Sequence, residues 1–165
     1  MPTQQSNQNT AKEDIMFAPK KILVPTDFSV YADNALKQAI DIAKQNKSKI
    51  FLFHVIDDGF QQCAVDYCID EGAVQKIYKD SIKNAKDKLH QEAKKITDNH
   101  AGIEIVYDTI RGVPSEEILK KQEAKGIDLI VIASHGKTGI LKNLMGGVVD
   151  KVMKRAKCQV LLVRS

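Results

Sequence analysis

The chain has 165 residues, of which 43% are hydrophobic, 28% charged and 5% aromatic, and its formal net charge at pH 7 is +4. This length is typical of one domain with a substantial core, and the composition is that of an ordinary soluble globular protein. Lysines alternate with acidic residues along most of the chain, whereas nucleic-acid-binding proteins gather positive charge and aromatic residues on one surface. We therefore expect no nucleic-acid partner.

The chain lacks the sequence features of a membrane or secreted protein. No apolar run approaches the length of a membrane span, and the N-terminus lacks the basic-then-apolar layout of a signal peptide. The three cysteines are an odd number, which argues against a disulfide framework and for a reducing compartment. We expect a cytoplasmic protein without a membrane partner, with a flexible polar tail over residues 1–19 and one domain over residues 20–165.

The first half of the predicted domain contains two strands and two helices. Residues 22–24 form a short apolar run ended by Pro25, and residues 50–56 form a second run, both typical of strands buried on two faces. Between them, Ser29 is predicted to cap a helix whose apolar residues recur at helical spacing. A long helix is predicted from about residue 73 to 99, and its inner stripe comprises Ile77, Ile82, Ala85, Leu89, Ala93 and Ile96.

The second half continues the alternation of strands and helices. Residues 102–112 and 127–133 are predicted strands, separated by a short helix that is capped at Ser115 and stops at Gly126. A helix is predicted from Gly147 to about residue 157, with Val148, Val152 and Met153 facing inward, and residues 159–164 form a fifth strand. Five strands alternating with helices predict a single doubly wound α/β domain, in which helices cover both faces of a parallel sheet.

Two strand ends carry unusual residues. Pro25, Thr26 and Asp27 follow the first strand, and a glycine-rich segment follows the fourth. Ligands of open α/β sheets bind beyond the carboxyl ends of the strands, where the winding reverses. If that point lies between strands one and four, the strand order is 3-2-1-4-5. An order of 2-1-3-4-5 would instead place strand three beside strand one, and the residues favour the first order.

Gly146 and Gly147 stand where the last helix begins. A helix N-terminus offers unpaired N–H groups and the positive end of the helix dipole, so it is suited to bind phosphate, and glycine allows a close approach of the backbone. Asp27 is placed to accept a hydrogen bond from a ribose. The alternative is that the glycines serve only the turn. His135 lies nearby, but a role in the architecture of the loop is favoured over ligand contact.

Four blocks of the chain, "KILVPTDFS", "IFLFHVID", "GVPSEEIL" and "DLIVIASHGKTG…GGVVDKVMKRAKCQVLLVR", together resemble the universal stress protein family. The resemblance runs from Lys20 to the end of the chain, apart from a variable stretch at about residues 58–75. It implies a sheet of order 3-2-1-4-5, homodimerisation and, in one subgroup, ATP binding.

That subgroup carries the motif G-x2-G-x9-G-[ST]. Its four positions fall on Ala133, Gly136, Gly146 and Gly147, so two of the four match. The resemblance implies that residues after the early strands flank the adenosine and that the glycines hold the phosphates. The predicted binding residues are Pro25, Thr26, Asp27, Ile50, Ile132, Ala133, Gly136, Gly146, Gly147 and Val148.

Gly147 stands where the subgroup has a hydroxyl. A hydrogen bond to a charged group contributes about 1.5–3 kcal/mol, so we expect an affinity roughly ten- to a hundredfold lower than with the hydroxyl. The predicted function is that of a stress-response regulatory homodimer, joined through residues 160–164, that binds ATP alone or with Mg²⁺ or Mn²⁺. The alternative is a dimeric interaction module without nucleotide. We predict no catalytic residue and no metal-binding residue, and at most slow ATP hydrolysis.

Overall fold

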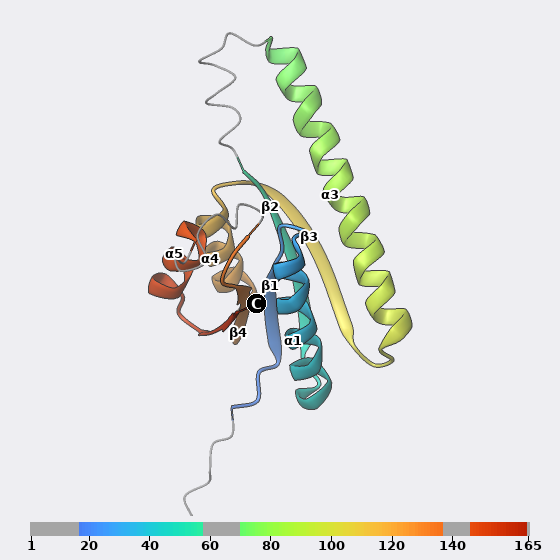
Figure 1. The fold of residues 1–165 in the computed structure, drawn as a ribbon, viewed down its shortest axis with the longest axis vertical. Helices are drawn as coiled ribbons and strands as arrows, with labels where there is room; N and C mark the ends of the chain where they lie inside the picture. The colour runs from blue at the N-terminus through green and yellow to red at the C-terminus, as the bar shows by residue number, and fades with distance from the viewer. Residues whose placement is uncertain (1–16, 58–69, 137–145, 165) are drawn as a thin grey trace, which may run out of the picture.

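The computed structural model describes residues 17–57, 70–136 and 146–164. Five strands form one parallel sheet in the order β3-β2-β1-β4-β5, with helices on both faces (Figure 1). The predicted fold class and strand order are confirmed. Residues 1–16 of the predicted tail lie outside the described residues. Two of the three cysteines, Cys63 and Cys68, also lie outside them. The strands are β1 (Lys21–Pro25), β2 (Lys49–Asp57), β3 (Glu104–Gly112), β4 (Leu129–Ala133) and β5 (Gln159–Val163).

The helices that cover the sheet are α1 (Val30–Asn46), α3 (Glu71–Asn99), α4 (Pro114–Lys125) and α5 (Gly147–Arg155). Ser29 caps α1 as predicted, since its side chain accepts a hydrogen bond from the Ala32 N–H at 3.2 Å. Gly126 ends α4 as predicted, with a φ of 58°. The start of α4 differs from the prediction, because the helix begins at Pro114 and Ser115 lies buried in its first turn. Proline suits this first position because its fixed φ is helical. An N–H group at this position would have no intrahelical acceptor, so its absence costs nothing.

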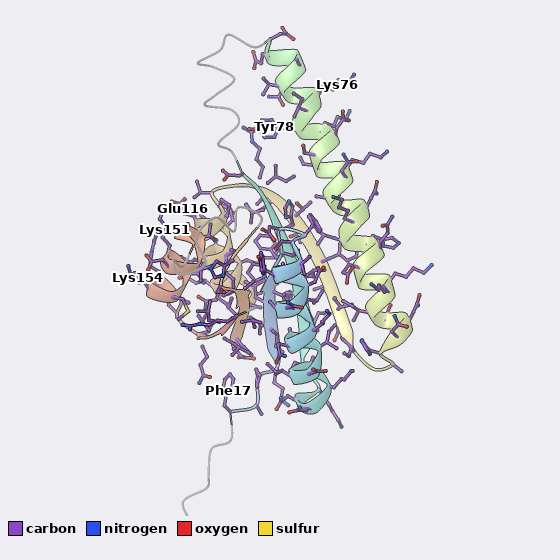
Figure 2. The ribbon with its side chains drawn as sticks, in the orientation of Figure 1. Phe17, Lys76, Tyr78, Glu116, Lys151 and Lys154 are labelled. Atoms are coloured by element: carbon purple, nitrogen blue, oxygen red, sulfur yellow. The ribbon has the colours of Figure 1, made fainter. Side chains whose placement is uncertain are left out.

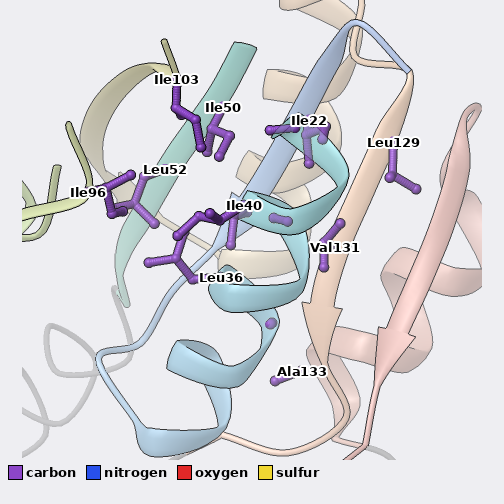
Figure 3. Packing of buried hydrophobic residues seen from close by; sticks show 14 of the residues in the cluster. Ile22, Leu36, Ile40, Ile50, Leu52, Ile96, Ile103, Leu129, Val131 and Ala133 are labelled. Atoms are coloured by element: carbon purple, nitrogen blue, oxygen red, sulfur yellow. The ribbon is translucent and has the colours of Figure 1, made fainter. Parts of the chain in front are cut away.

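Alternate residues of the strands belong to two separate core layers, one on each face of the sheet. Ile22 and Val131 point toward α1, where they meet Leu36 and Ile40, and the C-terminal half of α3 adds Ile96 to this layer (Figure 3). The strand residues in between, Leu23, Ile130 and Ile132 among them, face α4 and α5. This period of two is expected for strands that are buried on both faces.

Two predicted inner positions are wrong. Ile77 of α3 is 44% exposed and Met153 of α5 is 41% exposed, whereas Tyr78 and Val149 are buried. Each helical residue is turned by about 100° from the one before it, so neighbouring apolar positions compete for the inner face and only packing decides between them. Figure 2 shows Tyr78 and Lys76 on opposite sides of α3, and it shows Lys151 and Lys154 on the exposed side of α5.

Within the described ranges, no helix is both long and apolar enough to cross a membrane.

Candidate functional site

A cavity of about 350 Å³ lies beyond the carboxyl ends of β1 and β4. We call it the β1–β4 cavity. β1 pairs with β2 on one side and with β4 on the other, so the cavity stands at the point where the winding of the sheet reverses. Nine of the ten residues predicted to bind the ligand line it: Pro25, Thr26, Asp27, Ile132, Ala133, Gly136, Gly146, Gly147 and Val148.

Ile50, the tenth residue, lies elsewhere. It is the second residue of β2, it is fully buried, and it belongs to the core layer under α1. Strands rise about 3.3 Å per residue, which places Ile50 roughly 16 Å before Val55 along β2. Val55 lines the cavity, since it is near the carboxyl end of the strand. We therefore leave Ile50 out of the proposed site.

Several other residues that line the cavity do not belong to the predicted set. β2 contributes Val55 and Asp57, and α4 contributes Pro114 and Ile118. A signal for β2 was present in the sequence, because Phe53, Val55 and Asp57 share one face of the strand and approach its carboxyl end. The contribution of α4 depends on how that helix packs across the sheet, which no local pattern reveals.

Asp27 lies in a tight turn between β1 and α1. Its Oδ1 accepts a hydrogen bond from the Ser29 N–H at 3.0 Å, and the Phe28 N–H donates to Thr26 Oγ1 at 3.0 Å. Phe28 has a φ of 60°, a conformation that costs a bulky residue about 1–3 kcal/mol. The turn is therefore a strained one that its hydrogen bonds hold in place at the mouth of the cavity.

Gly136 lies against this carboxylate. A Cβ atom added at Gly136 would lie 2.6 Å from Asp27 Oδ2, which is a steric clash. The absence of a side chain thus lets the chain after β4 approach the end of β1. This contact explains the glycine at the second position of the motif without reference to a ligand.

The N-terminus of α5 faces the same cavity. Its first intrahelical bond runs from the Asp150 N–H to the Gly146 carbonyl at 3.0 Å, and Gly146 provides no side-chain cap. The helix leaves the N–H groups of its first turn, at Gly147, Val148 and Val149, without intrahelical acceptors. Open space surrounds the Cβ positions of Gly146 and Gly147. An anionic group could therefore approach these N–H groups.

His135 adds a polar group to the cavity wall. Its Nδ1 is hydrogen-bonded to Ser134 Oγ at 2.8 Å, and its ring centroid lies 6.0 Å from that of Tyr31. Its Nε2 is buried and has no hydrogen-bond partner in the part of the chain that the structure describes. An unpaired buried polar atom is costly, and a polar ligand in the cavity could satisfy it.

The fold and the cavity define a doubly wound α/β protein with a cavity at the switch point of its sheet. Residues 19–164 match the model of the universal stress protein family, and the chain belongs to that family.

Universal stress protein MJ0577 of Methanocaldococcus jannaschii is 33% identical over 153 residues, which cover 88% of this chain and 94% of the relative. The solved structure of MJ0577 has a TM-score of 0.72 at 31% identity and matches 90% of this chain and 98% of its own.

Two more distant universal stress proteins share the fold and were solved with nucleotides. One is a complex with cAMP, with 21% identity and a TM-score of 0.61 over 89% of this chain and 98% of that one. The other is a protein from Archaeoglobus fulgidus in complex with dAMP, with 17% identity and a TM-score of 0.54 over 88% of this chain and 98% of that one.

Proposed function

We propose that this protein binds ATP in the β1–β4 cavity as a regulatory ligand, with little or no turnover. The observation that carries the proposal is that the N-terminus of α5 and Asp27 line the same cavity. The helix N-terminus suits the phosphates, and the carboxylate suits the hydroxyl groups of a ribose. A cavity of about 350 Å³ falls in the usual range of ligand sites, roughly 300–1,000 Å³.

In this arrangement Gly136 and residues 146–148 face the phosphates, and the apolar side chains of Pro25, Val55 and Ile132 face the base. Mg²⁺ or Mn²⁺ would enter with the phosphates, whose oxygens are the kind of ligand that these ions take. The adenine nucleotides in the cAMP and dAMP complexes belong to the ligand class proposed here.

A direct test begins with the nucleotide that accompanies the purified protein. We expect denaturation to release an adenine nucleotide, and we expect the nucleotide-free protein to bind ATP in titration calorimetry, with and without Mg²⁺. Phosphate release from the bound ATP should stay near the uncatalysed rate. If no nucleotide co-purifies and ATP does not bind at millimolar concentration, the interaction module becomes the better explanation.

Replacing Gly147 by serine is expected to tighten ATP binding. The open space at this position admits a hydroxyl group beside the first-turn N–H groups, and its hydrogen bond to a phosphate is worth about 1.5–3 kcal/mol at most. The expected gain is therefore up to roughly a hundredfold in affinity, measured by calorimetry.

Gly147→Ala is the matched control, since it removes the flexibility of glycine without adding a hydroxyl. An equal gain in both variants would assign the effect to the helix backbone and would contradict the proposed contact with the phosphate.

We also propose that the protein acts as a cytoplasmic homodimer joined through β5, within one domain that spans residues 20–165. β5 is at one edge of the sheet, and Leu161 is 37% exposed. An unprotected strand edge tends to pair with another chain, and two copies related by a two-fold axis would pair in antiparallel orientation.

A further inference from the structure

The turn that presents Asp27 to the cavity receives a hydrogen bond from a neighbouring strand. Nδ1 of His54, on β2, lies 2.7 Å from the carbonyl oxygen of Thr26. A carbonyl oxygen can only accept a hydrogen bond, so Nδ1 carries the proton and donates it. His54 therefore holds the residue that directly precedes Asp27.

The rest of the turn is fixed on both sides of Asp27. The Thr26 N–H donates to the Phe53 carbonyl at 2.8 Å, which ties the amide side of Thr26 to β2 as well. On the far side, the Ser29 N–H donates to the Asp27 carboxylate, and Ser29 caps α1. Asp27 thus projects into the cavity from a short segment whose two ends are anchored, and His54 supplies a side-chain anchor at the first end.

The backbone conformation of Phe28 requires these hydrogen bonds on both sides of Asp27. Its φ of 60° lies in the left-handed region, which bulky residues rarely adopt, and such a conformation persists only where the surroundings over-determine it. The Phe28 ring lies against the imidazole, with the ring centroids 4.5 Å apart, and Lys88 Nζ is 5.2 Å from the centroid of the Phe28 ring. His54 thus contacts the strained residue as well as the carbonyl of Thr26.

From these contacts we infer that His54 is a positioning residue for the ligand site. Its Nδ1–H keeps the turn over residues 26–29 in the conformation that directs Asp27 into the cavity. This inference rests on the proposed binding of ATP. Without the donor, fewer molecules have the turn in its binding-competent form, and the apparent affinity falls in proportion to that fraction.

The experiment compares three variants of the full chain with the wild type. His54→Leu removes the donor and keeps an apolar side chain, whereas His54→Asn retains a side-chain N–H close to the backbone. His90→Leu is the matched control, because this exposed histidine of α3 does not line the cavity. Its Nδ1 is hydrogen-bonded to Tyr107 Oη at 2.9 Å. ATP affinity is measured by calorimetry, and the melting temperature is measured on the same samples.

We expect His54→Leu to weaken ATP binding about five- to tenfold, the effect of losing about one hydrogen bond. His54→Asn should stay within about twofold of the wild type, and His90→Leu should bind as the wild type does. Nitrogen NMR of the labelled wild type gives a second readout that does not depend on the folding of any variant. It should find Nδ1 of His54 protonated at neutral pH, with and without ATP.

Three results would each overturn the inference: unchanged affinity in His54→Leu, equal losses in the leucine and asparagine variants, or an unprotonated Nδ1. The two affinity results presuppose a wild type that binds ATP, whereas the NMR result does not. A wild type that does not bind overturns the proposed function itself, and the inference falls with it, so the two failures are distinguishable.

Discussion

Leu162→Pro is expected to convert the protein from a dimer to a folded monomer. The Val163 carbonyl accepts a hydrogen bond from the Ser134 N–H at 2.9 Å, so the backbone of Val163 faces the β4 side. Backbone groups alternate in direction along a strand, and the N–H groups of Val160 and Leu162 therefore point to the open edge. Proline at position 162 removes a donor from the dimer contact without removing one from the pairing with β4. Proline is tolerated in edge strands for this reason.

The measurement is sedimentation at micromolar concentration, and Val160→Pro should give the same result as Leu162→Pro. Leu162→Ala is the control, because it shortens the side chain and keeps the N–H. If the backbone edge carries the contact, the alanine variant remains a dimer. A wild type that sediments as a monomer under these conditions would exclude the proposed dimer, and a dimeric Leu162→Pro would place the contact on another surface.

Asp27→Ala is expected to weaken ATP binding by roughly ten- to a hundredfold, the effect of losing a hydrogen bond from a charged acceptor. The carboxylate also accepts from the Ser29 N–H, a hydrogen bond to a charged group that is worth about 1.5–3 kcal/mol to the folded state. For a protein of this size, the loss of that bond lowers the melting temperature by roughly 3–12 °C. The expected result is therefore a large loss of affinity in a protein that still folds.

Two further variants separate these contributions. Asp27→Asn retains an acceptor for the Ser29 N–H but loses the charge, so we expect wild-type stability with weakened binding. Ser29→Ala removes the cap of α1 at a cost of about 1 kcal/mol and leaves the carboxylate, so we expect lower stability with nearly unchanged affinity. Calorimetry and thermal unfolding measure both quantities. If Asp27→Ala lost stability but bound ATP as tightly as the wild type, Asp27 would be only a residue of the turn.

The fold could be predicted from the chain because its signals are local and repeated. Each strand is a short apolar run, each helix has an apolar stripe, and Ser29 and Gly126 mark helix ends with their own side-chain and backbone chemistry. The strand order also followed from local features, since polar and glycine-rich residues at two strand ends indicated where the winding reverses. Nine residues that line one cavity were accordingly found in segments more than 100 residues apart.

Other features were decided only by tertiary packing. Tyr78 rather than Ile77 faces inward because the rotation of α3 is set by what it packs against, and Val55 rather than Ile50 reaches the cavity because the register of β2 places it at the carboxyl edge. The hydrogen bond from His54 to Thr26 and the fit of Gly136 against Asp27 join segments that are remote in the chain. Periodicity indicates which face of an element is apolar. It does not indicate which side chains of other elements pack against that face. The contacts that shape the cavity therefore came from the structure, because they depend on distances between segments that are remote in the chain.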